Sequence, residues 1–234
     1  MYSKIFSRIY NEFGWNYYPE AFAGQLLTWL AANAPQAQRI LDLGCGTGVL
    51  CRILREHGFT ADGVDLSENM VAIAREADPE GRYDVGDMTV YEPEGRYDIV
   101  TCTGDAVNHL TDKAAVEKMF CKVYSYLEEG GVFIFDLLNE TEVPDPDPIE
   151  FRYDEHTDAS LQMTKDEAGI VTLKVRVKED GENVLEEIVT ERLYGTEIIR
   201  GLLENAGFAQ IAFAHRLLED GKDVPTWYVT AEKP

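Results

Sequence analysis

A short glycine-rich segment between a predicted strand and a predicted helix constrains the fold of this chain most strongly. The apolar run 39–43, interrupted only by Asp42, predicts a buried strand. The segment 44–48 (Gly-Cys-Gly-Thr-Gly) follows at once, and apolar residues at helical spacing begin at Val49. Glycines let the backbone approach a ligand, and the free amides of a helix N-terminus attract anions. A glycine triplet also occurs in turns that bind nothing, so its context decides the interpretation.

That context is an alternation of strands and helices through the first 138 residues. Ser67 is a favourable N-cap for one of these helices. Apolar strands that alternate with helices predict an α/β fold with a doubly wound, mostly parallel sheet. The ligand crevice of such a sheet lies at the carboxyl ends of the strands, where the glycine segment lies. After the run 39–43, the predicted strands lie at 63–66, 83–86, 97–101 and 132–138, and the helices at 49–57, 68–77 and 112–127.

The pattern changes after residue 139. Three prolines at 144, 146 and 148 exclude a regular helix or a central strand there. From 151 to 194 the apolar residues recur with period two, and Asp180-Gly181 is a turn signal between two strands. We expect residues 140–194 to be a small antiparallel β-sheet inserted after the fifth strand. The parent domain, residues 1–139 and 195–234, then resumes with one helix and two strands, which makes seven strands in its sheet.

The charge of the chain narrows its possible partners. The sequence has 21 Lys and Arg against 43 Asp and Glu, a formal net charge of −22. Phosphate backbones and anionic membrane surfaces would be repelled, so we expect neither nucleic acid nor membrane as a partner. The simplest alternative interpretation of this charge is that it only keeps the chain soluble. No apolar run approaches the ~20 residues of a membrane span, and no signal peptide is indicated.

Cysteine and histidine spacing argues against a metal centre. The four cysteines are scattered, without a Cys-x-x-Cys pair, and the four histidines show no His-Glu-x-x-His spacing. Reduced thiols in a cytoplasmic protein account for such cysteines better than disulfides do. We therefore expect no metal and a cytoplasmic location.

The segment 40–48 resembles motif I of the class I S-adenosylmethionine-dependent methyltransferases. Its spacing is G-x-G-x-G, whereas a dinucleotide fingerprint is G-x-G-x-x-G. The resemblance implies a Rossmann-like methyltransferase fold that binds S-adenosylmethionine, with the methionyl part of the cofactor at this turn. The implied contacts here are Asp42, Gly44, Cys45, Gly46 and Gly48.

Two further strand ends are similar to motifs of that family. Asp65 ends a predicted strand, and a carboxylate there can accept hydrogen bonds from both ribose hydroxyls. Its alternative role is to cap the next helix. The resemblance implies Leu66 and Met70 as adenine or ribose neighbours. It also implies that Gly86, Asp87 and Met88 meet the adenine ring, the alternative being a turn with a core methionine.

The segment 97–110 is similar to the fourth motif of the family, most closely in the glycine N-methyltransferase-like and amino-sugar N-methyltransferase branches. Those branches have Gly-Asn where this chain has Gly104-Asp105. The resemblance implies that Thr103 and Gly104 line the cofactor, and that Asp105, Asn108 and His109 face the methyl-transfer end. Asp105 and His109 are the candidate bases, although His109 could equally cap a helix or belong to the core.

The remaining candidates flank this domain. Tyr17 lies in a segment that resembles the cofactor cover of those branches. The insert, residues 140–194, occupies the place where those branches carry a substrate lid, which implies Arg152, Tyr153, His156 and Arg192 as candidate acceptor contacts. The alternative for each of these four is an ordinary residue of a solvated face. We expect methyl transfer to a small-molecule amine or hydroxyl by a monomer or homodimer. The alternative is a module that binds S-adenosylmethionine or S-adenosylhomocysteine without turnover.

Overall fold

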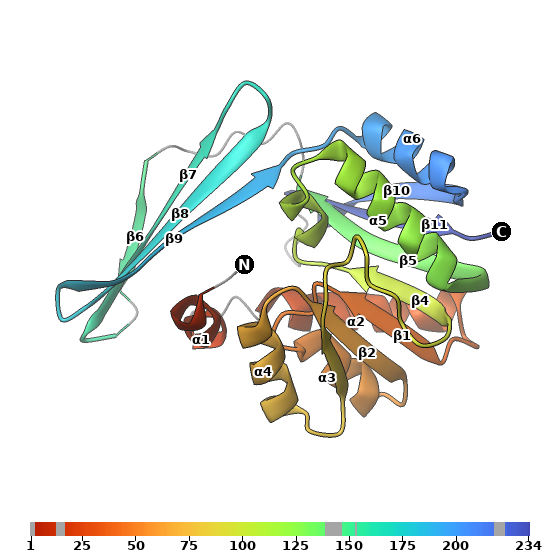
Figure 1. The fold of residues 1–234 in the computed structure, drawn as a ribbon, viewed down its shortest axis with the longest axis horizontal. Coiled ribbons are helices and arrows are strands. Elements are labelled where there is room, and N and C mark those ends of the chain that lie inside the picture. Colours follow the sequence, from red (N-terminus) through yellow and green to blue (C-terminus); the bar gives the residue numbers. More distant parts are fainter. Residues whose placement is uncertain (1–2, 13–16, 139–146, 153, 218–222) are drawn as a thin grey trace.

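The computed structural model describes residues 3–12, 17–138, 147–152, 154–217 and 223–234. It contains two sheets, shown in Figure 1. The seven-stranded sheet has the order β10-β11-β5-β4-β1-β2-β3, and the four-stranded sheet has the order β6-β7-β8-β9. The strands of the large sheet are β1 (Arg39–Leu43), β2 (Thr60–Asp65), β3 (Arg82–Val85), β4 (Tyr97–Cys102), β5 (Leu127–Leu138), β10 (Ala209–Leu217) and β11 (Asp223–Glu232).

The large sheet confirms the expected doubly wound topology. Strands β3, β2, β1, β4 and β5 pair in parallel, and β11 runs antiparallel to both β5 and β10. Strand β1 pairs with β2 on one side and with β4 on the other. The strand order therefore reverses beside β1, and the crevice at the carboxyl ends of β1 and β4 is the ligand position favoured by this topology.

Helices cover both faces of the large sheet because successive strand residues point to opposite sides (Figure 1). In β1, Leu41 and Leu43 pack in the core cluster under α5 and α6, whereas Ile40 packs in the cluster under α2, α3 and α4. This two-sided burial explains the nearly continuous apolar strands. The helices are α2 (Tyr17–Asn33), α3 (Val49–Glu56), α4 (Glu68–Ala77), α5 (Lys113–Tyr126) and α6 (Thr196–Ala206), with the 3-10 turn η1 (Ala106–His109).

The four-stranded sheet packs beside the carboxyl ends of the large one. Its strands are β6 (Ile149–Arg152), β7 (Thr157–Lys165), β8 (Ile170–Glu179) and β9 (Glu182–Arg192). The first helix, α1 (Lys4–Glu12), joins it to the parent domain, because Phe6 and Met70 share one apolar cluster with Val175, Val177 and Leu185. The N-terminus of α1 is also held by β9, where Glu187 accepts from Ser3 N at 3.0 Å and from its hydroxyl at 2.6 Å.

Two details differ from the sequence prediction. Strand β5 begins at Leu127 rather than at 132, because Leu127 pairs with Tyr97. A register shift that contains Gly130 and Gly131 follows before Val132 pairs with Ile99. The insert has four described strands, whereas the periodicity indicated two; β7 is mostly half-buried, so its sequence alternates weakly. No helix in the described ranges has both the length and the apolar character that a membrane crossing needs.

Candidate functional site

The glycine turn after β1 is held open by the neighbouring strand. The backbone amides of Gly44 and Cys45 donate to Val64 O at 2.7 and 3.0 Å, so the turn bends over the end of β2. Gly46 has a φ of 53°, and an added Cβ would meet no protein atom within 4 Å. At Gly48, with a φ of 76°, an added Cβ would lie 2.8 Å from the Tyr83 ring. Close packing against Tyr83 therefore requires a glycine at position 48, whereas Gly46 leaves space beside the backbone.

The Asp65 carboxylate occupies the end of β2 and contacts that turn. Its Oδ2 accepts from Gly46 N at 2.9 Å, and its Oδ1 accepts from Ser67 N at 2.8 Å. Each carboxylate oxygen has two lone-pair sites, so each retains capacity for one more donor. Burial raises the pKa of Asp65, and the two amides oppose that rise. The alternative helix-capping role is filled by Ser67 itself, whose hydroxyl accepts from Met70 N.

A cavity of about 40 Å³ lies directly over the turn. Tyr10 of α1 and Tyr18 of α2 form part of its wall. Thr47 donates through Oγ1 to Asn11 Oδ1 at 2.8 Å, which ties α1 to the turn. The N-terminal helices thus cover this end of the sheet. The cavity is lined by Tyr10, Tyr18, Pro19, Asp42, Gly44, Cys45, Gly46, Thr47, Val49, Leu50, Thr103 and Gly104.

Asp42 lies beneath the turn and is 3 % exposed. Its Oδ1 accepts from the Thr101 hydroxyl at 2.7 Å, and the Cys51 thiol lies 3.9 Å from its Oδ2. Burial raises the pKa of Asp42 to about 7, against the opposing hydrogen bond from Thr101. A carboxyl so placed supports the loop from below while it lines the cavity wall.

The region expected to hold adenine is open and partly apolar. Leu66 is 50 % exposed, and Val85, its neighbour at the end of β3, is 44 % exposed. Gly86 donates to Asp65 O, and Asp87, at the surface, accepts from Thr89 N at 2.8 Å. Met88 is half-buried against the main core. Met70 departs from expectation: it is 1 % exposed, because the cluster between α1, α4 and the small sheet buries it.

A buried carboxylate in β5 positions the chain after β4. Asp136 is 1 % exposed and accepts from Gly104 N at 3.2 Å and from Asp105 N at 3.0 Å. It also accepts from the Tyr18 hydroxyl. Asp105 has a φ of 55°, a left-handed conformation that Asp tolerates better than most residues. Asp136 therefore fixes both the cavity wall at Gly104 and the orientation of Asp105.

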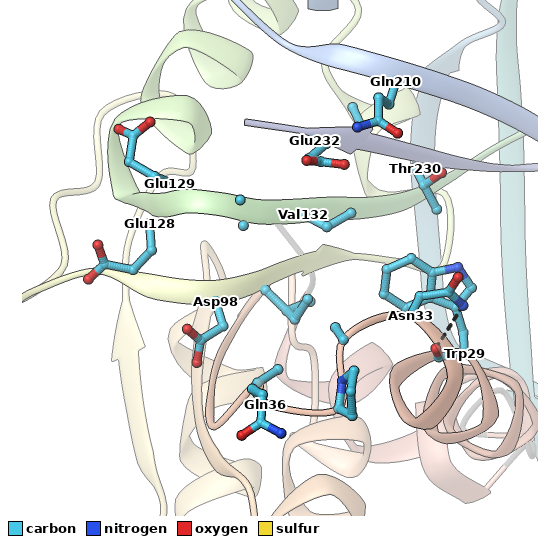
Figure 2. Close-up of a pocket in the computed structure, with 17 residues that line it drawn as sticks. Trp29, Asn33, Gln36, Asp98, Glu128, Glu129, Val132, Gln210, Thr230 and Glu232 are labelled. Atoms are coloured by element: carbon cyan, nitrogen blue, oxygen red, sulfur yellow. Dashed lines mark hydrogen bonds between the residues drawn. The ribbon is translucent and has the colours of Figure 1, made fainter. Parts of the chain in front are cut away.

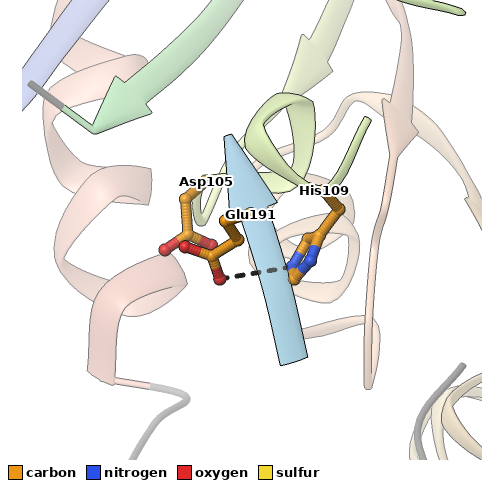
Figure 3. Close-up of side chains that lie close together, drawn as sticks. All are labelled: Asp105, His109 and Glu191. Atoms are coloured by element: carbon orange, nitrogen blue, oxygen red, sulfur yellow. Dashed lines mark ion pairs between the residues drawn. The ribbon is translucent and has the colours of Figure 1, made fainter. Parts of the chain in front are cut away.

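Three titratable side chains meet beyond that turn (Figure 3). Asp105 precedes η1, His109 is the last residue of η1, and Glu191 comes from β9 of the small sheet. Their ligand atoms lie within 4.8 Å of one another, and His109 Nε2 is 4.0 Å from Glu191 Oε1. The sequence predicts the first two residues but not Glu191. A trio of this kind could bind a cation, although the spacing of histidine and cysteine predicts no metal.

Burial shifts the proton affinity of all three groups. It raises the pKa of Asp105 well above its usual range, and the carboxylates of Glu191 and Asp136 add to that rise. It also raises the pKa of Glu191 to about 7. In contrast, burial lowers the pKa of His109, which therefore favours the neutral imidazole. Near neutral pH the two carboxyl groups thus retain protons that exposed acids would have lost.

Asn108 and Arg152, predicted as acceptor contacts, have other contacts. Asn108 is fully buried: its Nδ2 donates to Arg192 O at 2.7 Å, and its Oδ1 accepts from Leu138 N at 3.1 Å. It therefore links β9 to the end of β5. Arg152 is exposed on β6, at the opposite edge of the small sheet from β9, and donates to Asp154 O and Glu155 O.

The other flanking candidates are also placed away from the trio or cannot be placed. His156 pairs with Asp180 at an exposed turn, 2.7 Å apart. Arg192 points away from Glu191 along β9 and donates to Thr111 O at 3.2 Å. Tyr17 begins α2. Its side chain, and Tyr153 entirely, lie outside the described residues.

Sequence signals for the two missed residues do exist. Asp136 is the single charged residue in the apolar run 132–138, and a lone charge in a central strand requires a partner. Glu191 lies in phase with the buried Leu185 and Val189 of the same strand, so the period of two already directs it inward. An inward-facing acid in an alternating strand is therefore a sequence signal for a functional residue.

A larger cavity than the one over the glycine turn lies elsewhere, at the opposite end of the sheet (Figure 2). This groove of about 580 Å³ lies near the starts of β4 and β5. Asp98, Glu128, Glu129 and Glu232 are on its wall, together with Trp29 of α2. None of the predicted site residues lines it. The candidate site therefore stays at the carboxyl ends of β1 and β4, where the sequence motifs converge.

Comparison with known proteins identifies the family. Residues 15–211 match the family described as a methyltransferase domain. The chain is 27 % identical over 211 residues to the putative methyltransferase YqeM of Bacillus subtilis, which covers 85 % of this chain and 83 % of that protein. It is 28 % identical over 134 residues to a dTDP-3-amino-3,6-dideoxy-alpha-D-glucopyranose N,N-dimethyltransferase of Streptomyces fradiae. That match spans 57 % of this chain and 52 % of the relative.

Another relative, a putative methyltransferase of Geobacillus sp., is 40 % identical over 105 residues, and the match spans 42 % of its length. Among solved structures, an S-adenosylmethionine-dependent methyltransferase of Clostridium acetobutylicum superimposes with a TM-score of 0.82 at 22 % identity, covering 97 % of each chain. The amino pentose methyltransferase CalS10 of Micromonospora echinaspora superimposes with a TM-score of 0.81 at 22 % identity, covering 100 % of this chain and 98 % of that one. This chain therefore belongs to the methyltransferase-domain family, whose enzymes use S-adenosylmethionine as methyl donor.

Proposed function

We propose that this chain transfers a methyl group from S-adenosylmethionine to an amine nitrogen of a small polar molecule. The observation that supports this proposal most directly is that the residues lining the cavity over the glycine turn are adjacent in the chain to the acid–base residues. Thr103 and Gly104 line the cavity over the glycine turn, and Asp105 follows them directly, with His109 one turn later. A methyl donor bound beside Thr103 and Gly104 would thus lie close to side chains able to bind and deprotonate an acceptor.

The residues present fit the cofactor. Asp65 retains hydrogen-bonding capacity for the ribose hydroxyls, and the exposed side chains of Leu66 and Val85 offer an apolar surface for adenine. The space beside Gly46 accepts a ligand close to the backbone. When bound, the cofactor supplies an activated methyl group on a sulfonium sulfur. Tyr10 and Tyr18 form part of the wall of the cavity over the glycine turn.

The chain's own contribution to the reaction is mainly positioning. Holding an acceptor nitrogen in line with the methyl carbon can supply about 7–11 kcal/mol of the barrier reduction. The small sheet lies over this position through β9, so we propose that it acts as the acceptor lid. An amine, rather than a hydroxyl, is supported by the relatives that are named amino-sugar N,N-dimethyltransferases.

The test is turnover by the purified chain. Amino sugars, their nucleotide conjugates and the matching hydroxy compounds are incubated with S-adenosylmethionine, and S-adenosylhomocysteine is quantified. We expect product only with amines, and mass spectrometry should locate the methyl group on nitrogen. Turnover of the hydroxy compounds alone, or of none of the panel, contradicts the proposal. Asp65→Ala serves as the variant with impaired cofactor binding.

A further inference from the structure

The inserted sheet contributes a buried acid to the acceptor side of the site. Glu191 is 7 % exposed, and its inward direction follows from the alternation along β9. His109 Nε2 lies 4.0 Å from its Oε1. That distance is beyond a hydrogen bond, so His109 alone does not satisfy the carboxylate.

Asp105 places its carboxyl group beside that of Glu191, on the side away from His109 (Figure 3). Its backbone amide is bound by Asp136, but its carboxylate accepts no hydrogen bond from the described residues. No Lys or Arg in the described part of the chain forms an ion pair with Asp105 or Glu191. Two acids thus converge in a poorly solvated place without a Lys or Arg partner among the residues that the structure describes. A buried charge requires a partner, so a proton or a cationic ligand must supply it.

We propose that Asp105 and Glu191 form a two-carboxylate site that binds the protonated amine of the acceptor and accepts its proton before methyl transfer. This inference rests on the proposed N-methylation and names its substrate class, a primary or secondary ammonium compound. It assigns Glu191, a residue of the lid, to the catalytic group. The role of the lid is then chemical as well as steric.

Before binding, the two carboxyl groups share one proton, and the arrival of R–NH₃⁺ releases that proton to solvent. The carboxylate pair then takes one N–H proton and leaves the nitrogen lone pair free. The lone pair forms the N–C bond as the methyl C–S bond breaks, and the electrons of that bond stay on sulfur. The products are R–NH₂⁺–CH₃ and a neutral thioether, and the pair again holds one proton.

The surrounding charges agree with this assignment. Asp136 of β5 adds a third negative neighbour, and its contacts keep Asp105 oriented. Burial raises the pKa of Tyr10 of α1, and the charges of Asp105 and Asp136 raise it further, so Tyr10 stays a neutral hydroxyl. The lowered pKa of His109 keeps it from supplying a competing positive charge. The raised pKa values of both acids match a pair that awaits a cation.

The first experiment compares Glu191→Gln with Glu182→Gln, an exposed acid on the same strand. With an amine that the wild type methylates, we expect Glu191→Gln to raise KM about tenfold or more, equivalent to about 1.4 kcal/mol, while the S-adenosylhomocysteine Kd stays unchanged. Asp105→Asn should raise KM in the same way. The double variant should raise KM by less than the product of the two single effects, because the pair acts as a unit. Unchanged KM in Glu191→Gln, with normal wild-type turnover, overturns this inference alone.

A second measurement does not require the true acceptor. With saturating S-adenosylhomocysteine, ethylammonium chloride is expected to raise the Tm of the wild type and of Glu182→Gln more than sodium chloride at equal concentration does. Glu191→Gln should show no such difference. An equal response of all three proteins overturns the site even if no amine is turned over. Stabilisation by a divalent metal salt, with turnover abolished by a chelator, overturns it in favour of a metal bound by the trio.

Discussion

Oδ2 of Asp65 accepts a hydrogen bond from the backbone amide of Gly46 at 2.9 Å, so the end of β2 and the glycine turn after β1 share one carboxylate. This bond joins two motifs that are 19 residues apart in the chain. It gives the site a rigid corner before any ligand arrives. Preorganisation of this kind lowers the cost of binding, because the groups need no reordering.

Replacement of that carboxylate should weaken cofactor binding. In Asp65→Ala we expect the S-adenosylhomocysteine Kd to rise about 10- to 100-fold, since hydrogen bonds to a charged group contribute about 1.5–3 kcal/mol. Isothermal titration calorimetry measures the change. Glu68→Ala, an exposed acid three residues later, is the matched control and should bind like the wild type. Equal affinities of Asp65→Ala and wild type would show that Asp65 serves only the turn.

A pair of glycine substitutions distinguishes an effect on cofactor binding from an ordinary effect on helix stability. Gly46→Ala places a Cβ beside the cavity at a φ of 53°, where a non-glycine residue costs roughly 1–2 kcal/mol. Gly201→Ala adds a methyl group in open space on α6, where replacement of glycine by alanine stabilises by roughly 0.5–1 kcal/mol. Thermal melting and calorimetry should therefore show opposite Tm shifts, with cofactor binding lost only in Gly46→Ala. Retained binding in Gly46→Ala would place the ligand elsewhere.

Asp42 should make stability depend on pH. Its pKa is about 7 in the folded protein and 3.8 as the ordinary value, so the folded state binds more protons between these limits. The contribution of Asp42 to the free energy of unfolding therefore falls as pH rises from about 4 to about 7. The asparagine of Asp42→Asn cannot titrate, so the free energy of unfolding of this variant should rise relative to that of the wild type as pH rises over this range. Urea unfolding at about pH 5 and about pH 8 measures the difference, and parallel pH dependences would contradict the assignment.

How far the sequence predicts this protein depends on whether a feature is local. The strand, the glycine turn and the capping Ser67 are written in consecutive residues, and the structure has all three. The meeting of Glu191 with Asp105 joins segments more than 80 residues apart, and nothing in either segment encodes that distance. Met70 shows the same limit: the resemblance implies it as a cofactor neighbour, and its burial under α1 and the small sheet follows from contacts that its own segment does not encode. Local sequence patterns therefore predict the part of the candidate site proposed to bind the cofactor, whereas tertiary packing determines which residues meet in the part proposed to bind the acceptor.

Two buried tyrosine–carboxylate bonds allow a final test of how the N-terminal cover works. Tyr18 donates to Asp136 beside the cavity, and Tyr97 donates to Asp62 at 2.7 Å near the start of β4, away from the cavity lining. Either phenylalanine substitution removes a buried donor and should cost about 1–3 kcal/mol of stability. Only Tyr18→Phe should also weaken S-adenosylhomocysteine binding, because Asp136 holds Gly104 and Asp105 in place. Urea unfolding and calorimetry on both variants give the comparison. If both bind as tightly as wild type, the Tyr18 contact is structural and the cover closes by packing alone.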